Sequence, residues 1–508
     1  LGSIRTKLSQ IMAKRKYYLS KSTFLKGLQC EKALYFHKHH YKLKDEITET
    51  QQAIFDQGNS VGVLAHQLFP GGINCQPEVF YEYNKALTST KQALDHGRPV
   101  IYEAAFFFNG VFVYADILVE DEEGWKVYEV KSSTSVKEVN IQDAALQSYV
   151  IEQNGIKLKD VFIVHLDNTY ERDGEIQVEA LFTKTSVLSE IKTLLPRIPK
   201  EIERLKAVID RETLPEKSIG AHCSSPYSCD FMGQCWGHIP EDSIFDVGNL
   251  RTKKKFELYN QGIVLIKDIP DAFELSDKQR MQVEGVKNNT SYVDSMRLNQ
   301  FLDELHGPLY FLDFETMGSG VPLFDRTRPY QQIPFQYSLH VQDTDQIKHF
   351  EFLAETDGTD PRISFIKQLI LDCGSEGDIL VYNISFEQSK IEELIQAFPG
   401  YQVPLEGIIR RLKDLMIPFQ KGWYYTPEMK GSYSIKQVLP ALVPELSYKQ
   451  LNINEGGTAS TTFAAMANGT FDGGFEQTRI DLLEYCKMDT YAMVEILRVL
   501  RDRVKEYY

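Results

Sequence analysis

The chain has 508 residues, and at roughly 100 to 200 residues per domain this length excludes a single small module. Hydrophobic residues make up 43%, charged residues 25% and aromatic residues 12% of the chain, which excludes a largely disordered or coiled-coil protein. With 56 basic and 71 acidic residues, the net charge of −15 provides no global cationic field for a polyanion. Any contact with nucleic acid must therefore depend on local basic patches or on metal ions bound by carboxylates.

No apolar stretch predicts a membrane span, since the longest one, 104–119, is interrupted by polar residues. Residues 1–11 lack the apolar core of a signal peptide, and because Met12 begins a basic run we expect the residues before it to be an extension outside the native fold. Seven cysteines spread over this length do not fit a secreted disulfide framework. We expect a cytoplasmic protein with no membrane partner, in which clustered cysteines bind a metal.

The first half of the chain predicts a sheet preceded by helices. Residues 98–131 contain three runs rich in β-branched and aromatic residues, separated by an Asn-Gly pair and by an acidic turn. Because Asn-Gly between two such runs is a strong hairpin signal, we expect three consecutive antiparallel strands. Residues 139–153 carry the apolar spacing of a helix, and 160–166 form a short buried strand. With helices over 20–69, this half predicts an α/β or α+β layer.

Three further segments complete the predicted organisation. Residues 190–211 predict one amphipathic helix, followed by a loop rich in cysteine, glycine and proline over 222–240 that closes the first domain. Residues 245–305 are polar and mostly helical, and Gly262 between two amphipathic stretches indicates a helix-hairpin-helix-like linker. A new α/β pattern begins at Pro308 and continues to the end of the chain.

The first group of candidate site residues lies in the predicted hairpin. Glu129 and Lys131 are two apart on one strand and share a face, and Asp116 on the preceding strand can lie opposite them. Two carboxylates beside an ammonium suit a divalent cation that holds a phosphate oxygen while the lysine positions water. For a bare Glu-x-Lys, however, a solvated cross-strand salt bridge is the commoner explanation.

The surrounding residues resemble the RecB-type nucleases of the PD-(D/E)XK superfamily. The positions that carry the resemblance are, in chain order, Gly58, Gly62, His66, Glu103, Asp116, Glu129, Lys131, Gln147 and Tyr149. The resemblance implies a DNA-cleaving site with one or two Mg²⁺ or Mn²⁺ ions, in which Asp116 and Glu129 are metal ligands and Lys131 orients the attacking water.

The same resemblance assigns roles to four more side chains. His66 and Glu103 would be additional metal ligands. Gln147 and Tyr149 would brace the site or contact the nucleic-acid backbone, although they stand closer together than the family pattern places them.

Four cysteines form the second group. Cys223, Cys229 and Cys235 stand six residues apart in one loop, and Cys30 can supply a fourth thiolate. Four sulfur atoms suit tetrahedral Zn²⁺ or an iron–sulfur cluster, and the spacing alone does not decide between the two. Three unrelated free thiols are the remaining reading.

One cysteine near the start and three after the nuclease core resemble the iron–sulfur staple of the AddB and CRISPR-associated branches of the RecB-like family. The resemblance implies a [4Fe-4S] cluster, with Zn²⁺ as the alternative. The first gap is wider here than the Cys-x2-Cys of that family. Because linking residue 30 to residue 223 closes a long loop, we expect the cluster to be mainly structural.

Carboxylates of the C-terminal region form the third group. Asp313 and Glu315 lie two apart at the exit of an apolar strand, which is costly unless a cation neutralises them. Glu387 follows a second apolar strand, while Tyr485 and Asp489 are four apart on one helix face. Taken alone, the strand-end acids would be a capping motif.

The order Asp-x-Glu, then Asn-x2-Phe-acid, then Tyr-x3-Asp resembles the tyrosine-bearing DEDD exonucleases, whose fold is DnaQ-like. That family removes nucleotides from 3′ ends with two metal ions. The resemblance implies that Asp313, Glu315 and Asp489 are metal ligands and that Tyr485 hydrogen-bonds the nucleophilic water. Glu387 would be the fourth acid, where the family normally has Asp; Asp414 is the alternative.

Four lysines are candidates for contact with nucleic acid. Lys436 lies at the start of a predicted helix with Ser434 as candidate N-cap, where a phosphate can bind. Lys253, Lys254 and Lys255 form the clearest basic run of the linker. For each of them a solvated surface position is the commoner outcome.

These patterns together predict an α/β chain with a restriction-endonuclease-like domain over 17–240, a small helical linker over 241–305 and a ribonuclease H-like (DnaQ-like) exonuclease domain over 306–508. The combination resembles a little-characterised bacterial family in which these two nuclease types are fused. We expect a two-site, metal-dependent nuclease acting on nucleic acid, DNA with single-stranded ends being favoured, in repair or defence. The alternatives are a non-catalytic or single-site nucleic-acid-binding scaffold and a zinc-dependent structural or regulatory protein.

Overall fold

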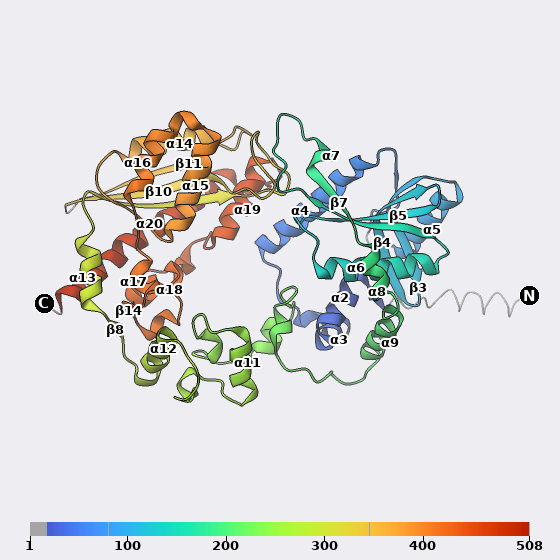
Figure 1. Ribbon diagram of the computed structural model, residues 1–508, viewed down its shortest axis with the longest axis horizontal. Helices are drawn as coiled ribbons and strands as arrows, with labels where there is room; N and C mark the ends of the chain where they lie inside the picture. Colours follow the sequence, from blue (N-terminus) through green and yellow to red (C-terminus); the bar gives the residue numbers. More distant parts are fainter. Residues whose placement is uncertain (1–17, 80, 345, 507–508) are drawn as a thin grey trace, which may run out of the picture. The chain divides into compact units, whose positions relative to one another are not determined.

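The computed structural model describes residues 18–79, 81–344 and 346–506 (Figure 1). The expectation about the residues before Met12 falls outside this part of the chain. Two compact units are formed, one from Leu1–His238 with Gly320–Pro329 and the other from Ile239–Ser319 with Tyr330–Tyr508. We call them unit 1 and unit 2. Both combine sheets with helices, so the prediction of a mixed α/β protein is confirmed.

Unit 1 is built on a seven-stranded sheet in the order β2-β3-β4-β5-β6-β7, with β1 paired to β4. The strands are β1 (Leu19–Ser20), β2 (Ile73–Asn74), β3 (Val100–Phe108), β4 (Val111–Asp121), β5 (Gly124–Lys131), β6 (Leu158–Leu166) and β7 (Phe182–Ser186). Asn109 and Gly110 have positive φ and turn β3 into β4, as the Asn-Gly signal predicts. The three consecutive antiparallel strands β3, β4 and β5 are therefore confirmed.

Helices cover the sheet of unit 1 and bury its core. They are α2 (Lys21–Gln29), α3 (Glu31–His39), α4 (Glu49–Ala65), α5 (Tyr83–Asp95), α6 (Glu138–Gln153), α7 (Val178–Leu181), α8 (Leu188–Leu194), α9 (Ile198–Ile209) and α10 (Met232–Trp236). The single helix predicted over 190–211 was wrong, because the chain forms α8 and α9 instead. Pro196 has no N–H for the helix ladder, and the regular hydrogen bonding of α8 ends just before it, at Leu194.

Unit 2 contains a five-stranded sheet in the order β11-β10-β9-β12-β13. Its strands are β9 (Leu309–Met317), β10 (Ile333–Asp343), β11 (Gln346–Leu353), β12 (Ile379–Val381) and β13 (Leu412–Asp414). The pairs β9–β10 and β10–β11 are antiparallel, whereas β9–β12 and β12–β13 are parallel. The second predicted α/β pattern thus forms one mixed sheet.

The side chains of β9 point alternately to the core of unit 2 and to a polar face of its sheet. Leu312 and Phe314 are buried in a cluster with side chains of three helices, α14 (Arg362–Cys373), α15 (Ile384–Ala397) and α16 (Gln402–Arg411). Residues two apart in a strand share a face, so Asp313 and Glu315 point the other way. On that face lies the long helix α20 (Phe475–Lys505), which contacts β9 and β10 (Figure 1).

The segment 241–305, predicted to be a helical linker, belongs to unit 2. It contains α11 (Thr252–Asn260), α12 (Asp277–Asn288) and α13 (Ser295–Asp303), and Ile244, Val247, Leu258, Ile266, Ile269 and Val283 form a small core of their own. Gly262 turns the chain after α11 with a φ of +82°. A short 3-10 turn follows it, and the next α-helix begins only at Asp277.

The remaining helices of unit 2 are short. They are α17 (Ile417–Gln420), α18 (Ile435–Leu442) and α19 (Gly456–Ala467), and β8 (Tyr292–Val293) pairs with β14 (Tyr424–Tyr425). None of the described helices combines the length and apolarity that a membrane crossing requires.

Candidate functional site

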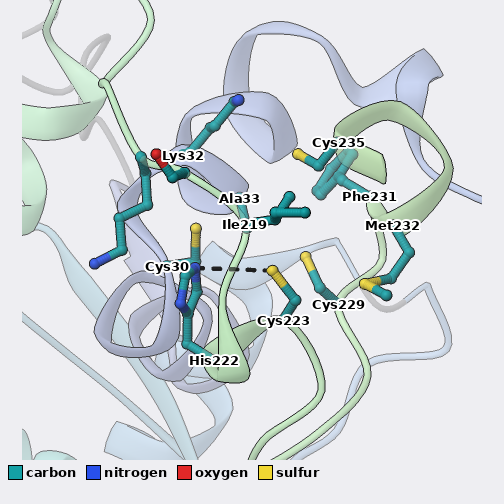
Figure 2. A pocket seen from close by; sticks show the side chains of 12 residues that line it. Cys30, Lys32, Ala33, Ile219, His222, Cys223, Cys229, Phe231, Met232 and Cys235 are labelled. Carbon is teal, nitrogen blue, oxygen red and sulfur yellow. Dashed lines mark hydrogen bonds between the residues drawn. The ribbon is translucent and has the colours of Figure 1, made fainter. Parts of the chain in front are cut away.

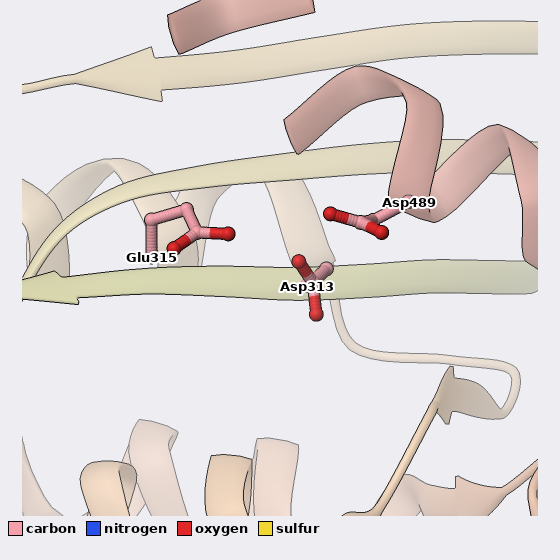
Figure 3. A group of neighbouring side chains, drawn as sticks. All are labelled: Asp313, Glu315 and Asp489. Atoms are coloured by element: carbon pink, nitrogen blue, oxygen red, sulfur yellow. The ribbon is translucent and has the colours of Figure 1, made fainter. Parts of the chain in front are cut away.

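Three carboxylates converge on one point in unit 2. Asp313 and Glu315 come from β9 and Asp489 from α20, and one oxygen of each lies within 4.8 Å of the others (Figure 3). In the described part of the chain, no other group of three or more His, Cys, Asp or Glu side chains gathers this closely. We call this group the acidic triad. The two-residue spacing on β9 and the helix laid over that face explain why acids so distant in sequence meet.

The acidic triad is short of positive charge. Burial, with the charge of Asp489, raises the pKa of Asp313 and of Glu315 well above the usual range. Burial likewise raises the pKa of Asp489 to about 6. A bound cation would offset the repulsion that keeps these carboxyl groups from ionising. Carboxylate oxygens are hard ligands, which Mg²⁺ and Mn²⁺ prefer. The donor set therefore fits the predicted divalent ions.

Two tyrosines and a lysine line the triad. Tyr448 donates a hydrogen bond of 2.6 Å to Asp489 Oδ1, and its ring centroid lies 6.3 Å from that of Tyr485. Lys436 Nζ lies 5.1 Å from the ring centroid of Tyr485 and 5.5 Å from that of Tyr448. It also donates to Asn454 O at 2.9 Å. Tyr485 and Lys436 had been singled out in the sequence, whereas Tyr448 lies in a segment without a recognisable motif.

The structure distinguishes Glu387 from Asp414. Asp414 accepts hydrogen bonds from the backbone N–H groups of Asn383, Ile384 and Met416, so it anchors the start of α15 and serves the fold. Glu387, in the first turn of α15, is buried, and burial raises its pKa to about 8. Its Oε2 has no hydrogen-bond partner among the described residues. Glu387 is therefore the better placed of the two candidates for a fourth acid.

A buried thiol lies behind the triad. Cys486 Sγ is 3.8 Å from Asp313 O and 4.0 Å from Asp313 Oδ2. Burial and the three nearby carboxylates raise its pKa well above the usual range, which keeps it a neutral thiol. No sequence pattern distinguishes this cysteine from other small core residues.

The candidate acids of unit 1 lie in one row across its sheet. The register pairs Tyr102 with Ile117 and Ala104 with Ala115, which places Glu103 opposite Asp116. The pairing of Ile117 with Tyr128 in turn places Asp116 opposite Glu129. We call Glu103, Asp116 and Glu129 the acidic row.

Glu129 accepts three hydrogen bonds from neighbouring side chains. Its Oε1 accepts hydrogen bonds from Lys21 Nζ at 2.8 Å and from Lys131 Nζ at 2.7 Å, and its Oε2 accepts one from Gln147 Nε2 at 2.7 Å. Lys131 Nζ also donates to Asp143 Oδ2 at 2.9 Å. Lys131 and Gln147 therefore both contact Glu129. Lys21 and Asp143 were missed, because nothing local in the sequence ties them to a strand far along the chain.

Lys131 is an ammonium ion in this environment. Burial lowers its pKa, but Asp143 and Glu129 outweigh that effect and raise it well above the usual value. A lysine in this state holds charge and position and does not accept a proton. Glu103 behaves in the opposite way: burial, with the charge of Asp116, raises its pKa to about 8.

Two predicted members do not join the row. His66 ends α4 and stacks on the ring of Tyr102 at a centroid distance of 4.0 Å, and no close ligand group with the acids includes it. Tyr149 is two positions from Gln147 on α6, so it points to another face of the helix and packs against Phe108. Tyr149 therefore does not brace the acidic row together with Gln147, because a helical step of two residues turns the side chain by about 200°.

The four predicted cysteines line one pocket of unit 1 (Figure 2). Cys30 lies between α2 and α3, Cys223 ends a 3-10 turn, Cys229 lies in the following loop and Cys235 belongs to α10. All four are free thiols, and burial raises the pKa of Cys229 to about 11. The structure thus brings Cys30 together with the three cysteines of the 223–235 loop.

The spacing of the sulfur atoms bears on the metal. Around a tetrahedral zinc ion with bonds of about 2.3 Å, sulfur atoms lie about 3.8 Å apart. No three of these cysteines bring their Sγ atoms within 4.8 Å of one another in the described structure. In each set of three, at least one Sγ–Sγ separation therefore exceeds the spacing around a single tetrahedral zinc ion.

The basic residues of the predicted linker divide into different roles. A cleft of unit 2 is lined by Lys255, Tyr382, Asn383, Lys430 and Ser434, at the carboxyl ends of β12 and β13. Lys254 pairs with Glu274 at 2.9 Å, and Lys253 does not line the cleft. Ser434 occupies the N-cap position of α18 as predicted, but its side chain makes no capping hydrogen bond.

One segment of the chain, most of it in unit 2, is similar to a family of unknown activity. Residues 310–434 match the model of a Domain of unknown function (DUF2779). This segment contains Asp313, Glu315 and Glu387 and ends before Tyr485 and Asp489.

Curated relatives are uncharacterized proteins of mycoplasmas. The chain is 28% identical over 289 residues to Uncharacterized protein UU173 of Ureaplasma parvum serovar 3, a match that covers 52% of this chain and 41% of that protein. It is 28% identical over 212 residues to the MG366 homolog of Mycoplasma pneumoniae, covering 38% of this chain and 32% of the relative. The chain thus spans less than half the length of these relatives. No solved structure matches it.

Proposed function

We propose that the chain is a metal-dependent nuclease with two active sites, one in each unit. The observation that carries the proposal is the acidic triad, in which three buried carboxylates meet with too little positive charge nearby to balance them. Such a group fits divalent ions that bind a phosphodiester and the water attacking it. Nucleic acid as the substrate, and 3′–5′ polarity for the site of unit 2, are proposed from the resemblance to the two nuclease families.

For unit 2 we propose a 3′–5′ exonuclease of the DnaQ-like, tyrosine-bearing type. The strand order β11-β10-β9-β12-β13, with two antiparallel and two parallel pairings, supports a ribonuclease H-like fold. Acids from the central strand β9 and from α20 support the site assignment. Bound Mg²⁺ or Mn²⁺ would stabilise the charge that develops on the attacking and leaving oxygens.

The chain's own residues then act around that reaction. Asp313, Glu315 and Asp489 would hold the ions, and Glu387, with its unpartnered Oε2, would contribute the fourth acid. Tyr485 would orient the attacking water by its hydroxyl group. Lys436, beside the tyrosine rings, would attract the phosphate backbone, because its charge already lowers the pKa values of the triad.

For unit 1 we propose a RecB-like nuclease site on the acidic row. Asp116 and Glu129 would hold the ion, and Glu103 would join them when ionised. Asp116 is already oriented, because its Oδ2 accepts the backbone N–H of Val130 at 2.7 Å. Lys131, held as an ammonium ion by Glu129 and Asp143, would position the water and the phosphate.

The cysteine pocket would hold a [4Fe-4S] cluster that ties α3 to the 223–235 loop. The cluster would supply mechanical linkage, and its four ligands would be Cys30, Cys223, Cys229 and Cys235. Cys223, Cys229 and Cys235 stand six residues apart, wider than the Cys pairs two to four residues apart that zinc sites favour, which supports this choice over zinc.

Nucleic acid with single-stranded ends, DNA in the first place, is the proposed substrate. The cleft at the carboxyl ends of β12 and β13 would guide the strand toward the triad, since α18 lines the cleft with Ser434 and carries Lys436 to the tyrosines. Lysines and aromatic rings suit a strand held by its phosphates and bases.

The test compares labelled single- and double-stranded DNA and RNA in Mg²⁺ or Mn²⁺. Wild type, Lys131→Ala and Asp313→Ala are incubated with each substrate, and Lys85→Ala, at an exposed lysine that pairs with Glu82, serves as a control outside both sites. We expect each site variant to lose one class of product and keep the other. Two variants that match wild type would refute the assignments, and binding without any cleavage would favour a scaffold.

A further inference from the structure

Both carboxylate oxygens of Glu129 accept hydrogen bonds from neighbouring side chains in this structure. Lys21 and Lys131 both donate to its Oε1, and Gln147 donates to its Oε2. Glu129 is only 1% exposed, so water has little access to it. Lys21 Nζ also lies 3.7 Å from Asp116 Oδ1, and thus between the two acids proposed to hold the ion.

The charges around this point are nearly balanced without a metal. The ammonium groups of Lys21 and Lys131 face the carboxylates of Asp116, Glu129 and Asp143. A divalent ion added to this set would bring a third cationic centre against the same three carboxylates. Two ammonium groups and an ion within contact distance of Glu129 would repel one another strongly in a buried site.

Lys21 is the cation that is held less firmly. Lys131 is within 3 Å of two carboxylates, Glu129 at 2.7 Å and Asp143 at 2.9 Å. Lys21 has one such contact, with Glu129 at 2.8 Å, although the two side chains are almost equally exposed, at 22% for Lys21 and 24% for Lys131. Lys21 is the first residue of α2 and has a flexible four-carbon stem, so the ammonium group can leave while the helix stays in place.

Two buried polar atoms beside Glu129 and Lys131 have no hydrogen-bond partner among the described residues. They are Asp143 Oδ1 and Gln147 Oε1, on residues that are 4% and 0% exposed. Buried acceptors without donors cost free energy, and both lie on α6 next to the groups that hold Glu129. These two oxygens can therefore accept hydrogen bonds from a lysine that has moved, or from water bound to a metal ion.

We propose that Lys21 is a built-in cation that occupies the ion's position between Glu129 and Asp116, and that a divalent ion binds to unit 1 by displacing it. The inference rests on the proposed metal site of unit 1 and adds a residue and a coupling that the resemblance does not supply. Lys21 thereby keeps the acidic row neutralised and folded before the ion arrives.

The first test measures Mn²⁺ affinity by electron paramagnetic resonance. The full chain carries Asp313→Asn and Asp489→Asn so that the acidic triad does not contribute. In this background Lys21→Met, which keeps the apolar stem, is expected to bind Mn²⁺ about tenfold tighter, or more, because the competing charge is gone. Lys26→Met is the matched control, since Lys26 lies on the same helix and pairs with Asp230.

Unchanged or weaker Mn²⁺ binding by Lys21→Met would overturn the displacement. Absence of Mn²⁺ binding in every protein would overturn both the displacement and the proposed metal site, so the two failures are distinguishable.

A second measurement needs no substitution at Lys21. The amine is acetylated in the same background with and without Mn²⁺, and the product is quantified by mass spectrometry. We expect Mn²⁺ to increase the acetylation rate of Lys21 several-fold and to leave that of Lys26 unchanged. An unchanged or reduced rate at Lys21 would overturn the proposal.

Discussion

Tyr448 donates its hydroxyl hydrogen to Asp489 Oδ1 at 2.6 Å, and so fixes the orientation of one carboxylate of the acidic triad. Partners of metal ligands commonly contribute about 10- to 100-fold to metal affinity or activity. We therefore expect Tyr448→Phe to weaken Mn²⁺ binding to the triad by about tenfold. The measurement is a Mn²⁺ titration in a Glu129→Gln background, which removes the site of unit 1.

Tyr292→Phe is the control for this prediction, because Tyr292 is an exposed tyrosine of the same unit. Equal Mn²⁺ affinity of Tyr448→Phe and wild type would show that the hydrogen bond does not orient a ligand.

Replacing one acid of the triad should stabilise the metal-free protein in a pH-dependent way. Burial, with the charge of Asp489, raises the pKa of Asp313 above its value in the unfolded chain, so the folded state is favoured when the group is protonated. The stability is therefore present at low pH and is lost as the pH rises through the folded pKa. In Asp313→Asn this loss is absent.

The measurement is a series of thermal melts in EDTA. The melting temperature of Asp313→Asn should exceed that of wild type by a margin that grows between about pH 5 and pH 8. Saturating Mn²⁺ should remove the margin, because the ion stabilises only the intact triad. A margin that shrinks with rising pH would contradict the charge assignment.

The cysteine pocket gives a prediction about colour and metal content. Anaerobically purified protein should be brown, absorb at about 400 nm and contain iron and sulfide. Cys30→Ser should lose the absorption, because it removes the only ligand outside the 223–235 loop. Cys75→Ser, a buried cysteine of the same unit outside the pocket, should keep it.

Metal analysis of the same samples decides the alternative. Zinc without iron in wild type would contradict the iron–sulfur assignment while leaving the pocket as a metal site.

A glycine near the start of the central strands offers a test of the fold alone. A Cβ atom at Gly377, where φ is +79°, would lie 1.9 Å from Pro308 O. Gly358 has a similar φ of +84° but open space around it. We expect Gly377→Ala to lower the free energy of unfolding of unit 2 by about 3 kcal/mol or more, against about 1 kcal/mol for Gly358→Ala.

Denaturant unfolding of the two variants measures this difference. Equal losses would mean that β9 and β12 are not packed as described.

The sequence predicted those features that local patterns determine. Asn109-Gly110 with its flanking β-rich runs predicted β3 to β5, and the spacing of Asp313 and Glu315 predicted two acids on one face of β9. Cys30 was assigned to the cysteine loop by its chemistry. A helix over 190–211 was predicted because its apolar period continues past Pro196, where backbone chemistry ends the helix.

Long-range partners could not be predicted in this way. Lys21 and Glu129 are 108 residues apart, and only the fold brings α2 to the end of β5. Tyr448 reaches Asp489 from a loop without a motif. Asp414 looked like a candidate ligand, because its hydrogen bonds to backbone N–H groups are invisible in the sequence.

The acidic triad is tested most directly by following a 5′-labelled single-stranded DNA in Mn²⁺ with Lys131→Ala, in which the site of unit 1 is disabled. The account predicts a ladder of products shortened stepwise from the 3′ end, and the loss of that ladder when Asp313→Asn is added. The account would be contradicted if Lys131→Ala with Asp313→Asn formed the ladder as fast as Lys131→Ala alone. It would also be contradicted if Lys131→Ala did not shorten the DNA.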